Sequence, residues 1–202
     1  MSSLGINNND DILIYDNSDL KSSCRLWFSL LYFGHDEKKI HILNGGLKKW
    51  IFENKPITKL TTEIIESNYV ANEKENLVVS FDQIKKNILS KSFNVIDARS
   101  LERFEGKVSE PRKGLRSGHI QNSFCLPFNQ CINQKTGEFK NLEELRELFN
   151  QNENIEKRLD QVFTCGSGVT AAVLAYAYKM VNNDYIPKIY DGSWSEYGKY
   201  PA

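Results

Sequence analysis

The feature that most constrains the fold is an internal repeat. Each copy reads as a β-forming run, a turn residue, an apolar helical stretch, a second strand, a glycine and an aromatic residue. The corresponding residues are Asp16 and Cys165 at the turn, Gly45 and Gly192, and Trp50 and Tyr197. The turn residue precedes the glycine by 29 positions in the first copy and 27 in the second, and each glycine precedes its aromatic partner by five. The repeat therefore predicts two related modules.

Strands alternate with helices in both copies, the order typical of an α/β fold around a mainly parallel sheet. We expect strands at residues 11–15, 40–43, 93–97, 123–127, 161–164 and 188–190, the first of them short and buried. We expect helices at 18–33, 47–52, 81–89, 141–149 and 171–181, the third capped by Ser80 or Asp82 and the fourth by Asn141. Residues 100–118 read as a charged segment and 191–197 as a final turn.

The two copies differ in length. Residues 57–76 are polar and lack periodicity, so they read as a linker between a first module at 1–56 and a second at 77–202. A helix, two strands and another helix precede Cys165 in the second module, whereas about ten residues precede the matching strand of the first. The first module thus corresponds to the C-terminal half of the second.

Composition excludes several classes of partner and ligand. The 26 basic and 26 acidic residues cancel, so no strong field favours nucleic acid or an anionic membrane. Four cysteines without a CxxC pair and three histidines without ligand spacing argue against a metal site, and no cofactor motif is present. No apolar run has membrane-spanning length. Free thiols suggest a reducing compartment and a cytoplasmic location; a mitochondrial one would need sequence upstream of Met1.

The segment Cys165-Gly-Ser-Gly-Val-Thr170 carries the chemistry. It joins a strand to an apolar helix through a glycine-containing loop, whose amides and helix dipole favour an anion. A thiol there should have a lowered pKa and exist partly as thiolate, although a buried structural cysteine is the simpler alternative. Asp16 takes the corresponding place in the first copy, and a carboxylate is no sulfur nucleophile. Only the second copy is therefore expected to be catalytic.

Several further segments share their spacing with one known family. They are Val95-Ile-Asp-Ala-Arg99, Arg103-Phe104, Glu110-Pro-Arg112, Ser117-Gly-His-Ile120, Tyr190-Asp-Gly-Ser-Trp-Ser-Glu196, and in the first module Tyr15-Asp16, Phe33-Gly-His35 and Leu43-Asn-Gly-Gly-Leu47. With the Cys165 segment, they make the chain resemble the tandem rhodanese-type sulfurtransferases, in particular those that use 3-mercaptopyruvate. The resemblance implies a catalytic rhodanese-like domain, preceded by part of an inactive one. Gln121-Asn122 depart from the family's usual Pro-Gly and alter a turn.

The loop composition separates members of this superfamily. A related phosphatase needs a longer loop ending in arginine, but Ala171 is the sixth residue after the cysteine here. Thiosulfate-using relatives carry basic residues within the loop, whereas Gly166, Ser167 and Gly168 are uncharged. The loop therefore suits a neutral or singly charged sulfur donor.

By resemblance, Arg103 and Arg112 clamp the carboxylate and keto group of mercaptopyruvate, since guanidinium forks fit carboxylates. From composition alone they would be ordinary surface arginines. The family's reaction forms a persulfide on Cys165, releases pyruvate and passes the sulfur to cyanide or to a thiol such as thioredoxin.

Roles for the remaining loop residues follow from the same resemblance. Ser167 is placed to bind the substrate carbonyl or to relay a proton, and the amides of residues 166–170, which include Gly166, Gly168, Val169 and Thr170, cradle the persulfide. His119 reads as part of a structural turn, and the other cysteines, Cys24, Cys125 and Cys131, as packing residues. Two other functions remain open: a thiosulfate:cyanide sulfurtransferase, and a truncated, inactive module with a binding or regulatory role.

Overall fold

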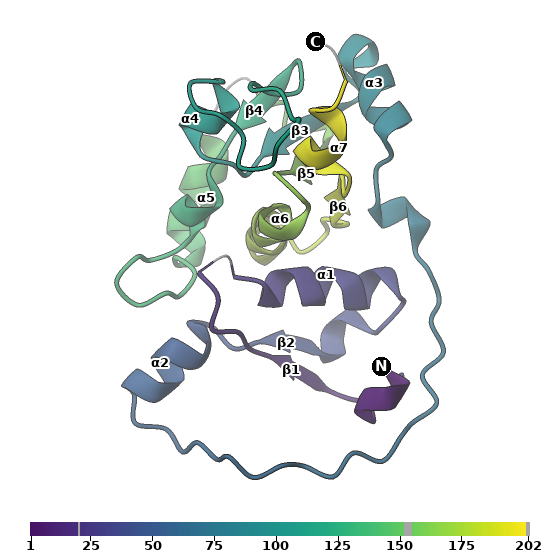
Figure 1. Cartoon of the computed structure of the whole chain (residues 1–202), viewed down its shortest axis with the longest axis vertical. Coiled ribbons are helices and arrows are strands. Elements are labelled where there is room, and N and C mark those ends of the chain that lie inside the picture. Colours follow the sequence, from purple (N-terminus) through teal and green to yellow (C-terminus); the bar gives the residue numbers. More distant parts are fainter. Residues whose placement is uncertain (20, 152–154, 201–202) are drawn as a thin grey trace.

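The protein is described by a computed structural model that covers residues 1–19, 21–151 and 155–200. It contains two parallel sheets, as the alternating sequence pattern predicted (Figure 1). The first has two strands, β1 (Ile12–Ile14) and β2 (Ile40–Ile42). The second has the order β4-β3-β5-β6, with bounds β3 (Phe93–Asp97), β4 (Ser123–Cys125), β5 (Asp160–Thr164) and β6 (Lys188–Ile189).

Seven α-helices are found in the described residues. They are α1 (Ser23–Tyr32), α2 (Gly46–Phe52), α3 (Phe81–Ser90), α4 (Leu101–Phe104), α5 (Leu142–Asn150), α6 (Val169–Val181) and α7 (Ser193–Tyr197). Ser80, not Asp82, caps α3 by accepting the Gln83 N–H at 3.3 Å, and Asn141 caps α5 as expected. The sequence did not predict α4 within its charged segment, and the expected final turn is the short helix α7.

Helix α6 lies at the centre of the molecule. Figure 1 shows it between the four-stranded sheet and α1, which in turn covers the two-stranded sheet. The rings of Trp27 in α1 and Tyr176 in α6 meet edge to face, with 5.0 Å between centroids. One continuous apolar core runs from Ile14 of β1 through Trp27 and Leu174 to Phe163 of β5. The two modules therefore share a core.

Two expectations for the first module were wrong. Helix α1 begins at Ser23 instead of residue 18, because the Asp16 carboxylate accepts the backbone N–H groups of Ser18 (3.1 Å) and of Ser23 (2.6 Å), the first helical residue. Strand β1 is only partly buried: Ile14 is in the core, but Leu13 and Tyr15 are each 59% exposed. Among the described residues, β1 pairs with β2 alone.

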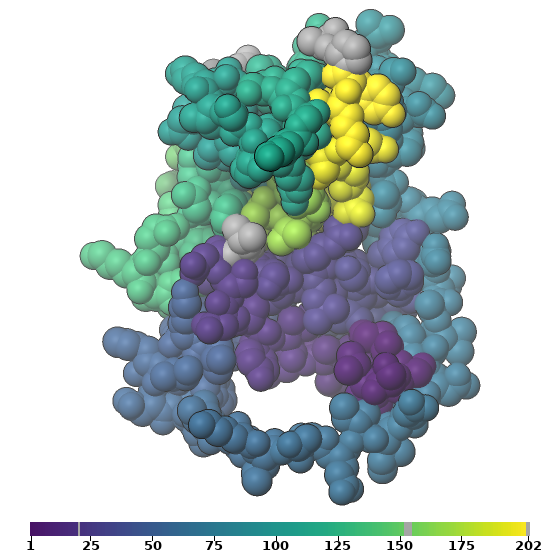
Figure 2. All heavy atoms as spheres, in the orientation of Figure 1, coloured from purple at the N-terminus to yellow at the C-terminus, as the bar shows by residue number. Residues whose placement is uncertain are grey.

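The expected linker region has no helix or strand between residues 53 and 74. Figure 2 shows the first part of this segment, in blue, arching away from the body and leaving an opening beside the first module. Further along, Ser67, Asn72 and Lys74 bond to the first module through their backbone N–H groups. Val78 then rejoins the fold by bridging to Ile189 in parallel. No helix in the described ranges is both long enough and apolar enough to cross a bilayer.

Candidate active site

The segment from Cys165 to Thr170, called the active loop below, lies at the carboxyl edge of the four-stranded sheet. Cys165 follows the last residue of β5, and α6 begins at Val169. Gly168 precedes α6 with a φ of 78°, a left-handed conformation that glycine adopts without steric cost. The loop therefore curls as its glycines predicted.

The sulfur of the buried Cys165 accepts one backbone N–H. Cys165 is only 2% exposed, and the Ser167 N–H donates to its Sγ at 3.4 Å. The loop opens the 13-residue helix α6, whose N-terminus carries partial positive charge. Gly166 and Gly168 are buried, whereas Ser167, Val169 and Thr170 are half-buried. The Ser167 N–H and the N-terminus of α6 therefore both face the cysteine.

A second segment, at the start of α7, braces the active loop. The Trp194 N–H donates to the Cys165 carbonyl at 2.9 Å, and the Ser195 N–H donates to the Gly166 carbonyl at 3.0 Å. The Ser193 hydroxyl accepts the Cys165 N–H at 3.3 Å. These bonds fix the loop backbone before any substrate arrives.

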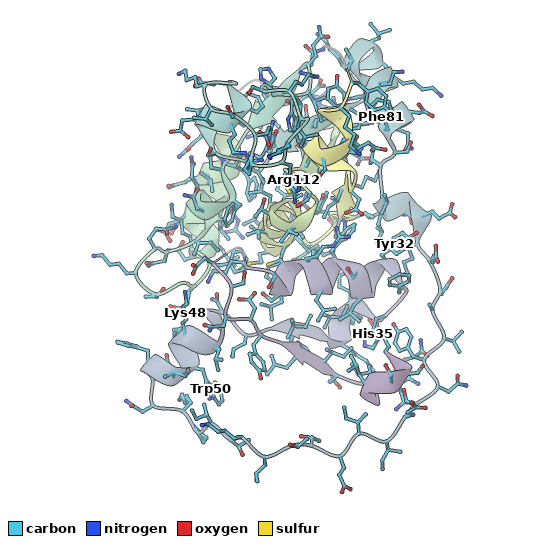
Figure 3. All side chains as sticks on the ribbon, viewed as in Figure 1. Tyr32, His35, Lys48, Trp50, Phe81 and Arg112 are labelled. Atoms are coloured by element: carbon cyan, nitrogen blue, oxygen red, sulfur yellow. The ribbon has the colours of Figure 1, made fainter. Side chains whose placement is uncertain are left out.

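Both predicted arginines reach the active loop. A Cβ placed on Gly166 would lie 3.1 Å from Nη2 of Arg103 and 3.5 Å from Nη1 of Arg112. Figure 3 shows Arg112 near the start of α6, beside α7. The structure thus brings Arg103, Arg112 and the loop together, although α4 and the residues after it are distant from the loop in sequence.

A buried ionic cluster orients Arg103. The Glu110 carboxylate accepts from Arg103 Nη2 at 2.5 Å and from Arg99 Nη1 at 2.8 Å. Arg99 also binds Asp97 (Nη2–Oδ2 2.7 Å) and stacks over the Trp194 ring. Together with Arg112, the cluster holds three arginines and two carboxylates, which leaves one positive charge beside the loop.

The other predicted residues lie as follows. His119 stacks on Phe104 and binds the Phe104 carbonyl through Nδ1 at 2.8 Å. Cys24 and Cys131 are fully buried, which confirms that they pack, and Cys125 is half-buried. Within the described ranges, no group of three His, Cys, Asp or Glu side chains could hold a metal ion.

Comparison with known proteins identifies the family of the chain. Residues 1–53 and 80–200 match the model of the rhodanese-like domain. The chain belongs to the rhodanese-like family. The linker separates the two matched ranges, and the first range is the shorter one, in keeping with a partial first module.

The relatives of this rhodanese-like chain are sulfurtransferases whose names give thiosulfate, 3-mercaptopyruvate or both as the sulfur donor. Thiosulfate/3-mercaptopyruvate sulfurtransferase 2 of Arabidopsis thaliana is 38% identical over 99% of the chain and 63% of its own length. The 3-mercaptopyruvate sulfurtransferase of Homo sapiens is 35% identical, and the thiosulfate sulfurtransferase of Gallus gallus is 34% identical, each over 96% of the chain. The chain spans 64% and 65% of the lengths of these two relatives.

Solved structures share the fold. SseA from Escherichia coli, a 3-mercaptopyruvate sulfotransferase, has a TM-score of 0.81 and 31% identity over 96% of this chain and 71% of its own. Tum1 from Saccharomyces cerevisiae has a TM-score of 0.85 and 26% identity over 98% of this chain and 69% of its own. The superposition covers both modules, so their arrangement is that of the family.

Sequence reasoning missed the supporting residues of this rhodanese-like site. Asp97, Arg99 and Glu110 stood in the family segments without an assigned role, and only their burial reveals how they hold Arg103. Ser193 and Ser195 also had no assigned role, although both lie in the family segment Tyr190–Glu196 and bond to the active loop. The available indication was a pair of charged residues, Asp97 and Arg99, directly after the apolar run of β3, whereas Glu110 lies within the charged segment and gave no such indication.

A groove lies away from the active loop, between α2 and residues 128–137. Its volume is about 660 Å³, and it is lined by Lys48, Phe52, Phe128 and neighbouring residues. None of its lining residues belongs to the active loop or to the arginine pair. The candidate site is therefore defined by the thiol and the charges around it, and not by this groove.

Proposed function

We propose that the chain is a sulfurtransferase that moves sulfur from 3-mercaptopyruvate to a thiol acceptor or cyanide through a persulfide on Cys165. The observation that carries this proposal is the meeting of Arg103 and Arg112 at Gly166 of an uncharged, thiol-bearing loop. One net positive charge beside the loop matches a monocarboxylate better than a dianion. We also propose residues 77–202 as the catalytic domain, 57–76 as the linker and 1–56 as the inactive half-domain.

The first half-reaction transfers sulfur to the enzyme. The Cys165 thiolate attacks the sulfur of mercaptopyruvate, an S–S bond forms and the C–S bond breaks. The electron pair of that bond leaves on pyruvate as its enolate, which takes up one proton to give pyruvate. Arg103 and Arg112 hold the carboxylate and keto oxygen, and the Ser167 hydroxyl binds the carbonyl or relays the proton. The amides of residues 166–170, including those of Val169 and Thr170, stabilise the terminal sulfur.

The second half-reaction restores the thiolate. An acceptor thiolate, such as that of a reduced thioredoxin, attacks the outer sulfur of the persulfide and leaves Cys165 as thiolate. When the acceptor is a dithiol, its second thiol forms a disulfide and releases hydrogen sulfide. Cyanide in place of the thiol gives thiocyanate. The four free cysteines of the chain are consistent with a reducing compartment such as the cytoplasm.

The direct test is pyruvate and sulfide release from 3-mercaptopyruvate with dithiothreitol present. We expect release by the wild type and a loss of at least a thousandfold in Cys165→Ser. Cys131→Ser is the matched control, because that thiol packs in the core away from the loop. A folded wild-type protein that releases no pyruvate, or a Cys165→Ser variant as fast as wild type, contradicts the proposal.

A thiosulfate:cyanide sulfurtransferase is the second candidate, because relatives of nearly equal identity carry that name. Thiocyanate formation from each donor at equal concentration separates the two functions. We expect mercaptopyruvate to be preferred, since the positive charge lies in the arginine pair and not in the loop. A higher kcat/KM with thiosulfate would assign the second function.

A non-catalytic binding module is the third candidate. It is favoured by the exposed side chains of Leu13 and Tyr15 and by the second edge of β1, which no other strand of the described residues covers. Turnover by the isolated chain in the assay above would exclude this candidate as the sole function.

A further inference from the structure

We propose that Arg25, supplied by α1 of the first module, is a positioning residue for the active loop that acts by neutralising Asp191. The inference rests on the proposed sulfur transfer at Cys165. Arg25 belongs to the first module, which has Asp16 where the second module has Cys165.

Arg25 and Asp191 form a forked ion pair between the modules. Both terminal nitrogens of Arg25 face the Asp191 carboxylate: Nη1 contacts Oδ1, and Nη2 lies 3.3 Å from Oδ2. Arg25 lies in the first turn of α1, whereas Asp191 lies between β6 and α7, 166 residues later. Their side chains are 33% and 40% exposed, so solvent screens the pair only in part.

The pair lies directly against the active loop. A Cβ placed on Gly168 would fall 2.8 Å from Arg25 Nη1 and would also overlap the Asp191 carboxylate. Gly168 has the left-handed φ that turns the loop into α6. The Arg25–Asp191 pair therefore flanks the loop at Gly168, while Arg103 and Arg112 flank it at Gly166.

The electrostatic consequence follows from the sign of each charge. The proposed reaction places negative charge in the loop three times, on the thiolate, the enolate and the persulfide. An uncompensated Asp191 carboxylate beside Gly168 would repel each of these anions. Arg25 cancels that charge, and its planar fork fixes the carboxylate in one place.

A second ion pair between the modules provides a matched control. Glu37, just before β2, lies 3.2 Å from Nζ of Lys179 near the C-terminal end of α6. Glu37→Gln removes one charged contact between the modules, as Arg25→Gln does, but it leaves the charges at the active loop unchanged. Lys179 keeps its bonds to the carbonyls of Asn183 and Tyr185 in this variant.

The experiment compares the two variants by three readouts: kcat and KM with mercaptopyruvate, the rate of Cys165 alkylation by iodoacetamide at neutral pH, and the melting temperature. We expect Arg25→Gln to lower kcat about tenfold or more with little change in KM, and to slow alkylation. Glu37→Gln should match the wild type in kcat and alkylation rate, whatever its melting temperature. Equal kcat and equal alkylation rates in the two variants would overturn the proposal.

Two further variants test neutralisation itself. Arg25→Gln/Asp191→Asn, which removes both charges, should be faster than Arg25→Gln alone. Arg25→Lys, which keeps the charge and loses the fork, should lie between wild type and Arg25→Gln. A double variant as slow as Arg25→Gln would rule out charge as the cause. Alkylation needs no turnover, so it reports on Arg25 even if mercaptopyruvate proves not to be the donor.

Discussion

At the scale of single residues, the four cysteines differ in what surrounds each sulfur atom. Burial raises the pKa of Cys131 to about 12, and burial, with the Asp97 carboxylate nearby, raises the pKa of Cys125 to about 12. Burial and the Asp16 carboxylate also raise the pKa of Cys24. At neutral pH, a thiol with a pKa of about 12 is ionised in roughly one molecule in a hundred thousand. The Sγ of Cys165 accepts the Ser167 N–H, one turn before α6 begins.

These environments predict selective alkylation. Brief treatment of the native protein with iodoacetamide at neutral pH should modify Cys165 alone, as mass spectrometry of the peptides would show. The rate at Cys125 should be low at neutral pH and rise about tenfold per pH unit below its raised pKa, because the thiolate is the reacting form. Cys131 is fully buried and should stay unmodified in the native protein. Fast labelling that persists in native Cys165→Ser would contradict this assignment.

At the scale of elements, the ionic cluster connects β3 to α4 and the segment after it. Glu110 lies between Arg99, at the end of β3, and Arg103 of α4, and its side chain is only 1% exposed. Removing one partner of a buried charge network leaves the others uncompensated. The cluster therefore supports both the fold and the orientation of Arg103.

We predict that Glu110→Gln lowers the free energy of unfolding by about 3 kcal/mol and raises KM for mercaptopyruvate. Denaturant unfolding and steady-state kinetics measure the two effects. Glu105→Gln, which breaks only the exposed pair with Lys107, is the control and should change neither quantity appreciably. A Glu110→Gln variant as stable as the control would show that the cluster contributes no net stability.

The elements were predictable from sequence where local signals and packing agree. Strand β3 and the capped helix α5 lie within one residue of expectation, because alternation, capping and burial all act there. Helix α1 was placed five residues early, because apolar spacing does not reveal that Asp16 would bind the amides of Ser18 and Ser23. In the site, a motif identifies Cys165, but the pairing of Arg25 with Asp191 depends on how the modules pack.

At the scale of the whole molecule, the contact between α1 and α6 makes one body of two modules. Trp27 is 2% exposed and packs against Tyr176, within a core that reaches both sheets. A shared core of this kind couples the unfolding of its parts. The linker residues Ser67, Asn72 and Lys74 bond to the first module through their backbone N–H groups.

We predict a single thermal transition for the chain and a loss of about 3–5 kcal/mol in Trp27→Ala. The replacement leaves a cavity between the modules, so it should lower the stability of both together. Melting curves recorded by far-ultraviolet and by near-ultraviolet circular dichroism should coincide in the wild type. Two separate transitions, with the later one unaffected by Trp27→Ala, would show that the modules unfold independently. Ile51→Ala, at an exposed position on α2, is the control.

The carboxylate of Asp16 has a consequence for how the two copies divide their work. It accepts amide bonds from Ser18 and Ser23 at the place where the second copy carries its thiol. The amides of the first loop are thus bound to the chain's own carboxylate. The amides of the active loop, in contrast, face a cysteine that gains and loses a sulfur atom in every proposed cycle. Asp16 thereby acts as a fixed internal support for the first module, and Arg25 of α1 gives the active loop a neighbour that keeps its positive charge throughout the proposed cycle.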